Sequence, residues 1–279
     1  MTGIATSSGL IGDALAERLA RFPQPNPVAA PLIASDALKC ARRIGFRLFG
    51  TVPDIPLTQA ERARFEDGDH IDAIVSETVA RELDGRIQVP FNWLPGAPLK
   101  GKADAGYRSA DGRKVILEAK SASQKAFARA IGMYESVPAA PKVEWLLQGG
   151  LAACSPVIDA PLVHVVLVDN ESLTPPRKPQ VAEWLVDVDA SVELQDAPER
   201  GAATVRQLVE AEVARQVLIL SACEGGTLPP RDVPGYGIVA NPPAKDEYGD
   251  PWQCRWCPFQ PTCSKLGPGP VDDFGEVAA

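Results

Sequence analysis

The sequence predicts a mixed α/β fold with a helical N-terminal part and a loop-rich C-terminal tail. Helical patterns come first along the chain, strand patterns follow, and the two then alternate, which is the order expected when helices pack on a mixed sheet. The chain has 279 residues, 45% of them hydrophobic and 23% charged, so it can bury a sizeable core. Its longest apolar stretch, near residues 162–168, is far shorter than the roughly 18 residues of a membrane span. We therefore expect no membrane partner.

The first 30 residues are expected to form a separate N-terminal part. Residues 9–22 have the apolar spacing of a short amphipathic helix, and a proline-rich connector follows over residues 23–31. No basic residues precede the apolar stretch, and Asp13 and Glu17 interrupt it, which is not typical of a secretory signal. We therefore expect a cytoplasmic protein in a reducing compartment.

Two helices are predicted before the first strand. Ser35 is the expected N-cap of a helix that continues to Gly50, where glycine supplies the stop. Thr58 and Glu61, three residues apart, form the pattern of a capping box. This pattern predicts a second helix over residues 58–83.

Strand patterns then begin, and strands and helices alternate to the end of the core. We expect strands over residues 86–93, 99–108 and 113–120, helices over 123–135 and 142–153, strands over 161–169 and 181–188, and a helix over 204–223. The last helix precedes Gly225 and Gly226, and many prolines and glycines follow. We place the core domain at residues 31–226 and the tail at residues 227–279.

The most informative chemical pattern is a predicted hairpin closed by the turn sequence SADG at residues 109–112. The numbers of paired residues across this turn sum to about 221 or 222, which places Asp104 opposite Glu118, with Cβ atoms about 5 Å apart. Lys120 shares a strand face with Glu118 because it lies two residues further on. Ala119 points the other way, so its backbone carbonyl is an additional candidate oxygen ligand.

Two neighbouring carboxylates repel each other when both are ionised, and a divalent cation removes that conflict. Oxygen ligands suit Mg²⁺ or Mn²⁺, and an adjacent amine could orient or deprotonate a water, which fits phosphodiester hydrolysis. His70, on the helix over residues 58–83, could complete the site or simply be exposed. His164 lies in an apolar strand, where a packed neutral ring is expected. The alternative interpretation of the whole hairpin is a surface ladder of salt bridges.

Charge is unevenly distributed along the chain. The net charge of −8 argues against a generally basic nucleic-acid binder. Residues 39–47 nevertheless hold four basic side chains and no acid, and residues 97–129 hold eight basic and three acidic side chains. Basic patches on an acidic body suit a site that accepts a polyanion at one place, although ordinary solvated faces would look the same.

Three cysteines gather in the tail segment CRWCPFQPTC. Cys254 and Cys257 have the C-x₂-C spacing that lets two thiolates converge on one metal centre, and Cys263 follows. The candidates for a fourth ligand are Cys40, Cys154 and Cys223. Basic neighbours of Cys40 favour its thiolate. Zinc and iron–sulfur remain alternatives, and a bond to Cys40 would clamp the tail over the N-terminal helices.

Taken in chain order, these residues resemble the PD-(D/E)XK nuclease superfamily, and within it the iron–sulfur RecB-like exonucleases of the CRISPR-associated and phage branch and the AddB nuclease domain. The ordered series that carries the resemblance is Cys40, His70, Asp104, Glu118, Lys120, Cys254, Cys257 and Cys263. It extends over about residues 31–264, and the ordered set is specific although each piece alone is weak.

The resemblance implies a restriction-endonuclease-like αβββαβ core and a [4Fe–4S] cluster on the four cysteines. It implies a Mg²⁺ or Mn²⁺ ion held by His70, Asp104 and Glu118, with Lys120 catalytic. It also implies exonuclease action on DNA, commonly at single-stranded ends.

The resemblance also bears on DNA contacts. Arg42 and Arg43, just after Cys40, are candidates for phosphate contacts, unless they form an exposed basic helix face. The family often has a Gln-x₃-Tyr motif; here Gln148 is present, but Ala152 stands at the tyrosine position. Gln148 is therefore retained as a candidate DNA-binding residue, without the contacts assigned to the tyrosine.

Three alternative functions remain open from the sequence. The first is an endonuclease or end-trimming nuclease that works with CRISPR or recombination proteins. The second is a non-catalytic DNA-binding scaffold that keeps only the cysteine centre. The third is a zinc-stabilised binding module.

Overall fold

A computed structural model describes residues 32–93, 97–133, 140–170, 180–192, 203–231, 254, 257–267 and 269–274. The helix expected over residues 9–22, the connector that follows it and part of the tail lie outside the described residues. In chain order the elements are β1 (Leu32–Ile33), η1 (Ala34–Asp36), α2 (Ala41–Leu48), α3 (Gln59–Glu82), β2 (Arg86–Trp93), β3 (Ala97–Arg108), β4 (Lys114–Ala122), α4 (Gln124–Ala130), α5 (Val143–Ala153), β5 (Leu162–Asp169), β6 (Val181–Asp187), β7 (Ser191–Val192), β8 (Ala203–Thr204), α6 (Val205–Glu224) and α7 (Gln260–Lys265).

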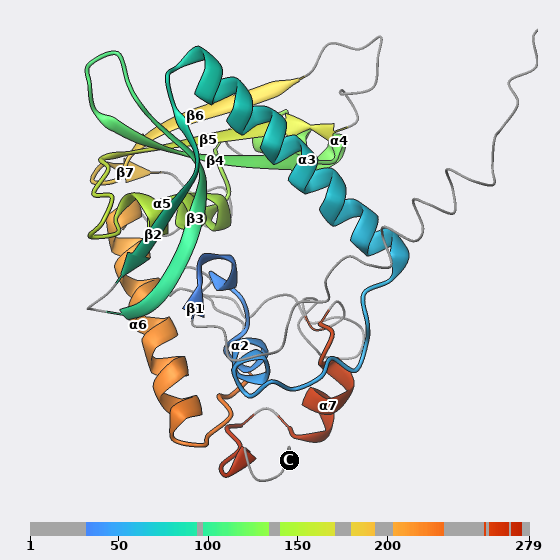
Figure 1. Cartoon of the computed structure of the whole chain (residues 1–279). Coiled ribbons are helices and arrows are strands. Elements are labelled where there is room, and N and C mark those ends of the chain that lie inside the picture. Colours follow the sequence, from blue (N-terminus) through green and yellow to red (C-terminus); the bar gives the residue numbers. More distant parts are fainter. Residues whose placement is uncertain are drawn as a thin grey trace, which may run out of the picture.

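The centre of the fold is a mixed sheet (Figure 1). Within the described part of the chain it has six strands in the order β1-β3-β4-β5-β6, with β2 also paired to β3. The pairs β1–β3 and β4–β5 are parallel, and the pairs β2–β3, β3–β4 and β5–β6 are antiparallel. Apart from the short helix α4 between β4 and α5, the series α3, β2, β3, β4, α5 and β5 gives the αβββαβ order of a restriction-endonuclease-like core. The predicted fold class is confirmed.

Helices cover both faces of this sheet. Ile71 of α3 packs with Ala105, Leu117 and Val166 on one face. On the other face α5 lies between the sheet and α6, as the order of the ribbons in Figure 1 also shows.

Two adjacent glycines allow the close approach of α5 to its neighbours. A Cβ on Gly149 would lie 2.7 Å from Val163 Cγ1 and 3.2 Å from Glu118 Cβ, and one on Gly150 would lie 2.7 Å from Val205 Cγ1. Any larger side chain would therefore push the helix away from the sheet or from α6.

Local signals in the sequence set several element boundaries. β2 occupies residues 86–93, as predicted. The capping box at the start of α3 is formed, because Thr58 N donates to Glu61 Oε2 at 2.8 Å and Glu61 N donates to Thr58 Oγ1 at 3.2 Å. The capping pattern therefore located the start of the helix correctly.

The helix predicted from Ser35 begins later than expected. Residues 34–36 form a short 3₁₀ turn, and α2 starts only at Ala41. Leu38, with a φ of 63°, interrupts the helical conformation between them. Gly50 has a φ of 69° and ends this segment, as predicted.

The described part of the tail packs against α2. Phe46 of α2 stacks on Phe259 at a centroid distance of 5.0 Å and meets the edge of Phe274 at 5.7 Å. Leu228 pairs with Val271 through two backbone hydrogen bonds, of 2.8 and 3.0 Å. Figure 1 accordingly shows α7 beside α2 at the bottom of the molecule. This is the placement expected for a tail clamped over the N-terminal helices. Among the described residues, no helix combines the length and hydrophobicity needed to cross a membrane.

Candidate functional site

Asp104, Glu118 and Lys120 meet where β3 and β4 separate. The two strands pair at Ala105–Leu117 and Gly106–Ile116, so the residue numbers sum to 222, and the same register places Asp104 opposite Glu118. The described backbone pairing of β3 with β4 ends at Ala105, and beyond it the side chain of Asp104 binds the backbone of β4. Ala119 N donates a hydrogen bond of 2.7 Å to Asp104 Oδ2. The carboxylate is therefore held against the backbone of β4, between Glu118 and Lys120.

The other two charged groups form a short ion pair. Lys120 Nζ lies 2.5 Å from Glu118 Oε1. Glu118 is only 6% exposed and faces α5, where the absence of a side chain on Gly149 makes room for it. The ammonium is only partly buried, so one side of the site is open to solvent. The hairpin is thus not a row of exposed surface salt bridges.

Burial raises the pKa of Asp104 above its ordinary value of 3.8. The backbone N–H of Ala119 and the positive charge of Lys120 oppose this effect, in that order of size. A raised pKa means that the carboxylate is poorly compensated where it lies. A cation that approached from the open side would supply the missing compensation.

His70 does not join this group. It is exposed on α3, whose neighbouring Ile71 packs on the sheet face that carries Leu117. Successive strand residues point to opposite faces, so Glu118 lies on the α5 side instead. Accordingly, the described residues contain no group of three His, Cys, Asp or Glu side chains placed to hold a metal ion. The three-ligand set expected with His70 is not assembled, and the carboxylates Asp104 and Glu118 with the neighbouring Ala119 backbone are the oxygen donors at hand.

The predicted DNA-binding residues have different environments. Gln148 is half-buried on α5, immediately before the glycine that faces Glu118, so it lies beside the site. Arg43 is half-buried. Arg42 is fully buried at 0% exposure, so the expectation that it contacts phosphate is wrong. Its guanidinium is turned inward, toward backbone carbonyls of the tail.

Two lysines that the sequence reasoning did not single out lie on the same strand as Asp104. Lys100 and Lys102 are exposed on β3 and have the same parity as Asp104, so all three side chains share one face of that strand. The signal was present as the net positive charge of residues 97–129. Only the strand assignment shows that part of this charge leads toward the carboxylates.

The tail cysteines lie in the neighbourhood of Cys40, at the start of α2. Cys257 N donates to Cys254 O at 3.1 Å, which closes the turn of the C-x₂-C pair. Cys257 and Cys263 belong to the apolar cluster with Phe46, and Cys40 is the N-cap of α2. Burial raises the pKa of the Cys257 and Cys263 thiols, and each is also raised by its proximity to Cys40.

The remaining cysteines are in apolar surroundings. Burial raises the pKa of Cys154 and of Cys223 to about 11, whereas Cys40 is close enough to raise the pKa of both Cys257 and Cys263. Cys40 is therefore the best fourth partner for the tail cysteines. The donor set fits a thiolate-bound metal centre in its chemistry, although the described thiols are neighbours and not a closed cage.

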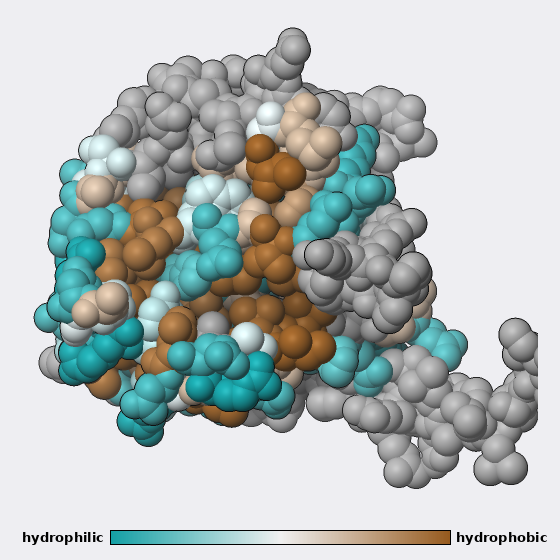
Figure 2. All heavy atoms as spheres, turned by 90° about the horizontal axis from the view of Figure 1, so that it is seen from above, coloured by the Kyte–Doolittle hydropathy of each residue, from teal (hydrophilic) through white to brown (hydrophobic). Residues whose placement is uncertain are grey.

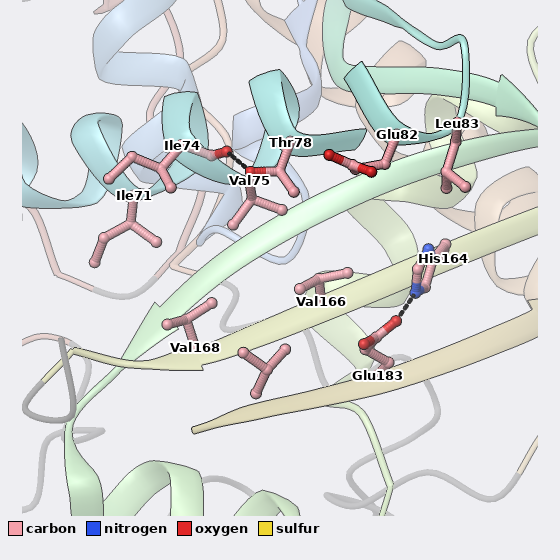
Figure 3. Close-up of a pocket in the computed structure, with 11 residues that line it drawn as sticks. Ile71, Ile74, Val75, Thr78, Glu82, Leu83, His164, Val166, Val168 and Glu183 are labelled. Atoms are coloured by element: carbon pink, nitrogen blue, oxygen red, sulfur yellow. Dashed lines mark hydrogen bonds and ion pairs between the residues drawn. The ribbon is translucent and has the colours of Figure 1, made fainter. Parts of the chain in front are cut away.

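The opposite face of the sheet carries an apolar pocket of about 540 Å³ (Figure 3). It lies between α3 and the outer strands β5 and β6, and it is lined mainly by isoleucine, valine and leucine. His164 at its floor accepts or donates hydrogen bonds with Tyr107 Oη at 2.8 Å and with Glu183 Oε2 at 3.0 Å, and burial lowers its pKa. The view from above in Figure 2 likewise shows hydrophobic residues in the middle of the surface and hydrophilic ones along its left and lower edges. The pocket lining includes none of the three charged residues Asp104, Glu118 and Lys120.

Comparison with known proteins supports the fold. No protein-family model and no curated protein match the sequence. The crystal structure of SSO0001 superposes with a TM-score of 0.50 at 14% identity, over 92% of this chain and 98% of that one. This chain shares its fold with SSO0001. Two structures of LHK-Exo, an alkaline exonuclease from Laribacter hongkongensis, give TM-scores of 0.44, for the complex with dAMP, and 0.42. Their identities are 14% and 11%, and both alignments cover 70% of this chain and 89% of that one.

Proposed function

We propose that this protein is a metal-dependent deoxyribonuclease that acts as an exonuclease, most readily on single-stranded ends. The observation that carries the proposal is the grouping of Asp104, Glu118 and Lys120 where β3 leaves β4. A partly solvent-exposed ammonium beside two carboxylates, one of them with a raised pKa, is an arrangement found where charge must be handled during a reaction.

Asp104 and Glu118 would hold Mg²⁺ or Mn²⁺, with the Ala119 carbonyl as a further oxygen ligand. When bound, such an ion lowers the pKa of water and neutralises charge on a phosphoryl oxygen. Lys120 would orient the attacking water and stabilise negative charge as it develops on the phosphate. The hydrogen bond from Ala119 N keeps Asp104 in place for this role.

The surroundings of the site suit one strand of DNA. Exposed Lys100 and Lys102 would contact the phosphates of a DNA strand that leads to Asp104, and Gln148 would contribute a further polar contact. Arg43, on α2, stays a candidate phosphate contact away from these residues. Because these contacts go to phosphate, we expect little dependence on base sequence and a strong dependence on salt.

The cysteine centre would be structural. Cys40, Cys254, Cys257 and Cys263 would hold a [4Fe–4S] cluster, or a zinc ion as the alternative, and so fasten the tail to α2. Partners from CRISPR or recombination systems remain part of the proposal because the resemblance includes such proteins.

The test is DNA degradation by charge variants of the site with Mg²⁺ or Mn²⁺. Asp104→Asn and Lys120→Met should each reduce the rate by at least about a hundredfold, in line with loss of a catalytic group. Asp111→Asn, in the exposed turn of the same hairpin, and Lys114→Met, at the other end of β4, are the matched controls. Full activity in both site variants would exclude this site assignment, whereas no DNA degradation by the wild-type protein would favour the non-catalytic scaffold function.

A second assay separates the exonuclease from an endonuclease. Linear single-stranded DNA should be degraded progressively, whereas covalently closed single-stranded circles should persist. Cleavage of circles as fast as linear DNA would favour the endonuclease alternative.

A further inference from the structure

Arg42 has an environment that a positive charge rarely occupies. The residue is fully buried, at 0% exposure, on the first turn of α2. Arg42 Nε donates to Pro229 O at 3.0 Å, and the terminal nitrogens donate to the carbonyls of Gly267 and Gly269. These acceptors are neutral. Among the residues that the structure describes, no carboxylate contacts the guanidinium.

A buried charge without a counter-charge is strongly unfavourable, because carbonyl dipoles replace only part of the lost hydration. The remaining hydrogen-bond acceptor of Arg42 is sulfur: Arg42 Nη1 lies 3.8 Å from Cys263 Sγ, within the range of an N–H···S contact. Cys40 lies two residues before Arg42, and Cys257 shares the apolar cluster of Cys263. Among the described groups that contact the guanidinium, the Cys263 thiol is therefore the one that can become negative.

We propose that Arg42 is a buried counter-charge of a thiolate-bound metal centre at Cys40, Cys254, Cys257 and Cys263, and that its N–H donor to Cys263 positions that ligand. Arg42 is thus a positioning residue of the centre and not a phosphate-binding residue. Four thiolates around Zn²⁺, or around an iron–sulfur core, leave the centre with net negative charge, which a buried cation compensates.

The inference rests on the cysteine centre of the proposed function. It makes a prediction that differs from that of a structural latch, that is, an Arg42 that only fastens the tail to α2 through the backbone carbonyls. With metal present, the Arg42 charge is compensated, so its removal is unfavourable. Without metal no metal–thiolate centre is present to compensate the charge, so its removal should be harmless or favourable. A latch that acts only through the backbone carbonyls would matter equally in both forms.

The experiment compares the wild-type full chain with two variants. Arg42→Met keeps most of the side-chain volume, and Arg42→Lys keeps the positive charge but not the planar set of guanidinium N–H donors. Arg81→Met is the control, because Arg81 is exposed on α3 and its substitution removes the same net charge. Iron, sulfide and zinc content, visible absorption and the rate of metal loss to a chelator are measured after anaerobic purification. Thermal unfolding is measured before and after the metal is stripped.

We expect Arg42→Met to lose metal about 10–100 times faster than wild type, the range known for residues that support metal ligands. Arg42→Lys should recover much of this loss, and Arg81→Met should behave as wild type. The unfolding temperature of Arg42→Met should fall in the loaded form and stay equal or rise in the stripped form. If the metal is iron–sulfur, the midpoint potential of Arg42→Met should become more negative, because the buried charge stabilises the reduced cluster.

Equal destabilisation of the loaded and stripped forms by Arg42→Met would overturn the inference and leave only a latch. A Cys263→Ser background keeps the test valid where Arg42→Met alone folds poorly, since the effect of Arg42 on metal loss should largely disappear there. If the wild-type protein holds no metal whose binding requires Cys40 and Cys263, the inference and the cysteine centre are both overturned. That result would leave the nuclease proposal standing, because the DNA assay of Asp104 variants tests it separately.

Discussion

Replacing Gly149 by alanine should damage the candidate active site more than it damages the fold. The new Cβ would lie 2.7 Å from Val163 Cγ1 and 3.2 Å from Glu118 Cβ. Overpacking of this kind costs about 1–3 kcal/mol, and the better helix propensity of alanine offsets about 1 kcal/mol of it. We therefore expect a net loss of up to about 2 kcal/mol, which for a chain of this size lowers the unfolding temperature by at most about 8 °C.

The same substitution one residue further on provides the matched control. A Cβ on Gly150 would lie 2.7 Å from Val205 Cγ1 and 2.8 Å from Val209 Cγ2, on the α6 side of the helix. Its cost in stability should be similar, but it does not press on Glu118. DNA degradation is measured for both variants at a temperature at which both remain folded. We expect at least a tenfold lower rate for Gly149→Ala and a near wild-type rate for Gly150→Ala.

Two results would refute this reasoning. A fully active Gly149→Ala protein would show that the position of Glu118 does not matter for the reaction. Equal loss of activity in the two glycine variants would show that α5 acts through general stability and not through its contact with the site.

Three further predictions concern stability. The raised pKa of Asp104 means that its contribution to stability is greatest below about pH 3.8 and is lost as the pH rises through the raised value. Denaturant unfolding at pH 4 and pH 7 should therefore show Asp104→Asn becoming more stable relative to wild type at the higher pH. The opposite trend would contradict the raised pKa. Phe46→Ala should lower the free energy of unfolding by about 3–5 kcal/mol through loss of the ring contacts with the tail, whereas Leu83→Ala at an exposed position should change it by less than about 0.5 kcal/mol. Thr58→Ala should reduce it by about 1 kcal/mol, and Glu61→Ala should add little to that loss because the two side chains form one reciprocal cap; fully additive losses would argue against a shared capping box.

Local patterns made the hairpin site predictable. The turn sequence at residues 109–112 fixed the register, so the pairing of Asp104 with Glu118 and the shared face of Lys120 followed from counting residues. The capping box at Thr58 and the strand over residues 86–93 were predictable for the same reason. Hydrogen bonds between near neighbours decide each of these features, and the residues that form them are visible within a short window.

What the sequence by itself determined is therefore the order of the elements, their approximate ends and the grouping of the hairpin charges. Only the tertiary structure decided that Arg42 is buried, because its partners at Pro229, Gly267 and Gly269 are about two hundred residues away in the chain. Only the rotation of α3 on the sheet decided that His70 is exposed while Ile71 is buried against the strands. Both outcomes depend on which surfaces meet when distant segments pack, and that choice is made by the burial of the whole core and not by any local pattern.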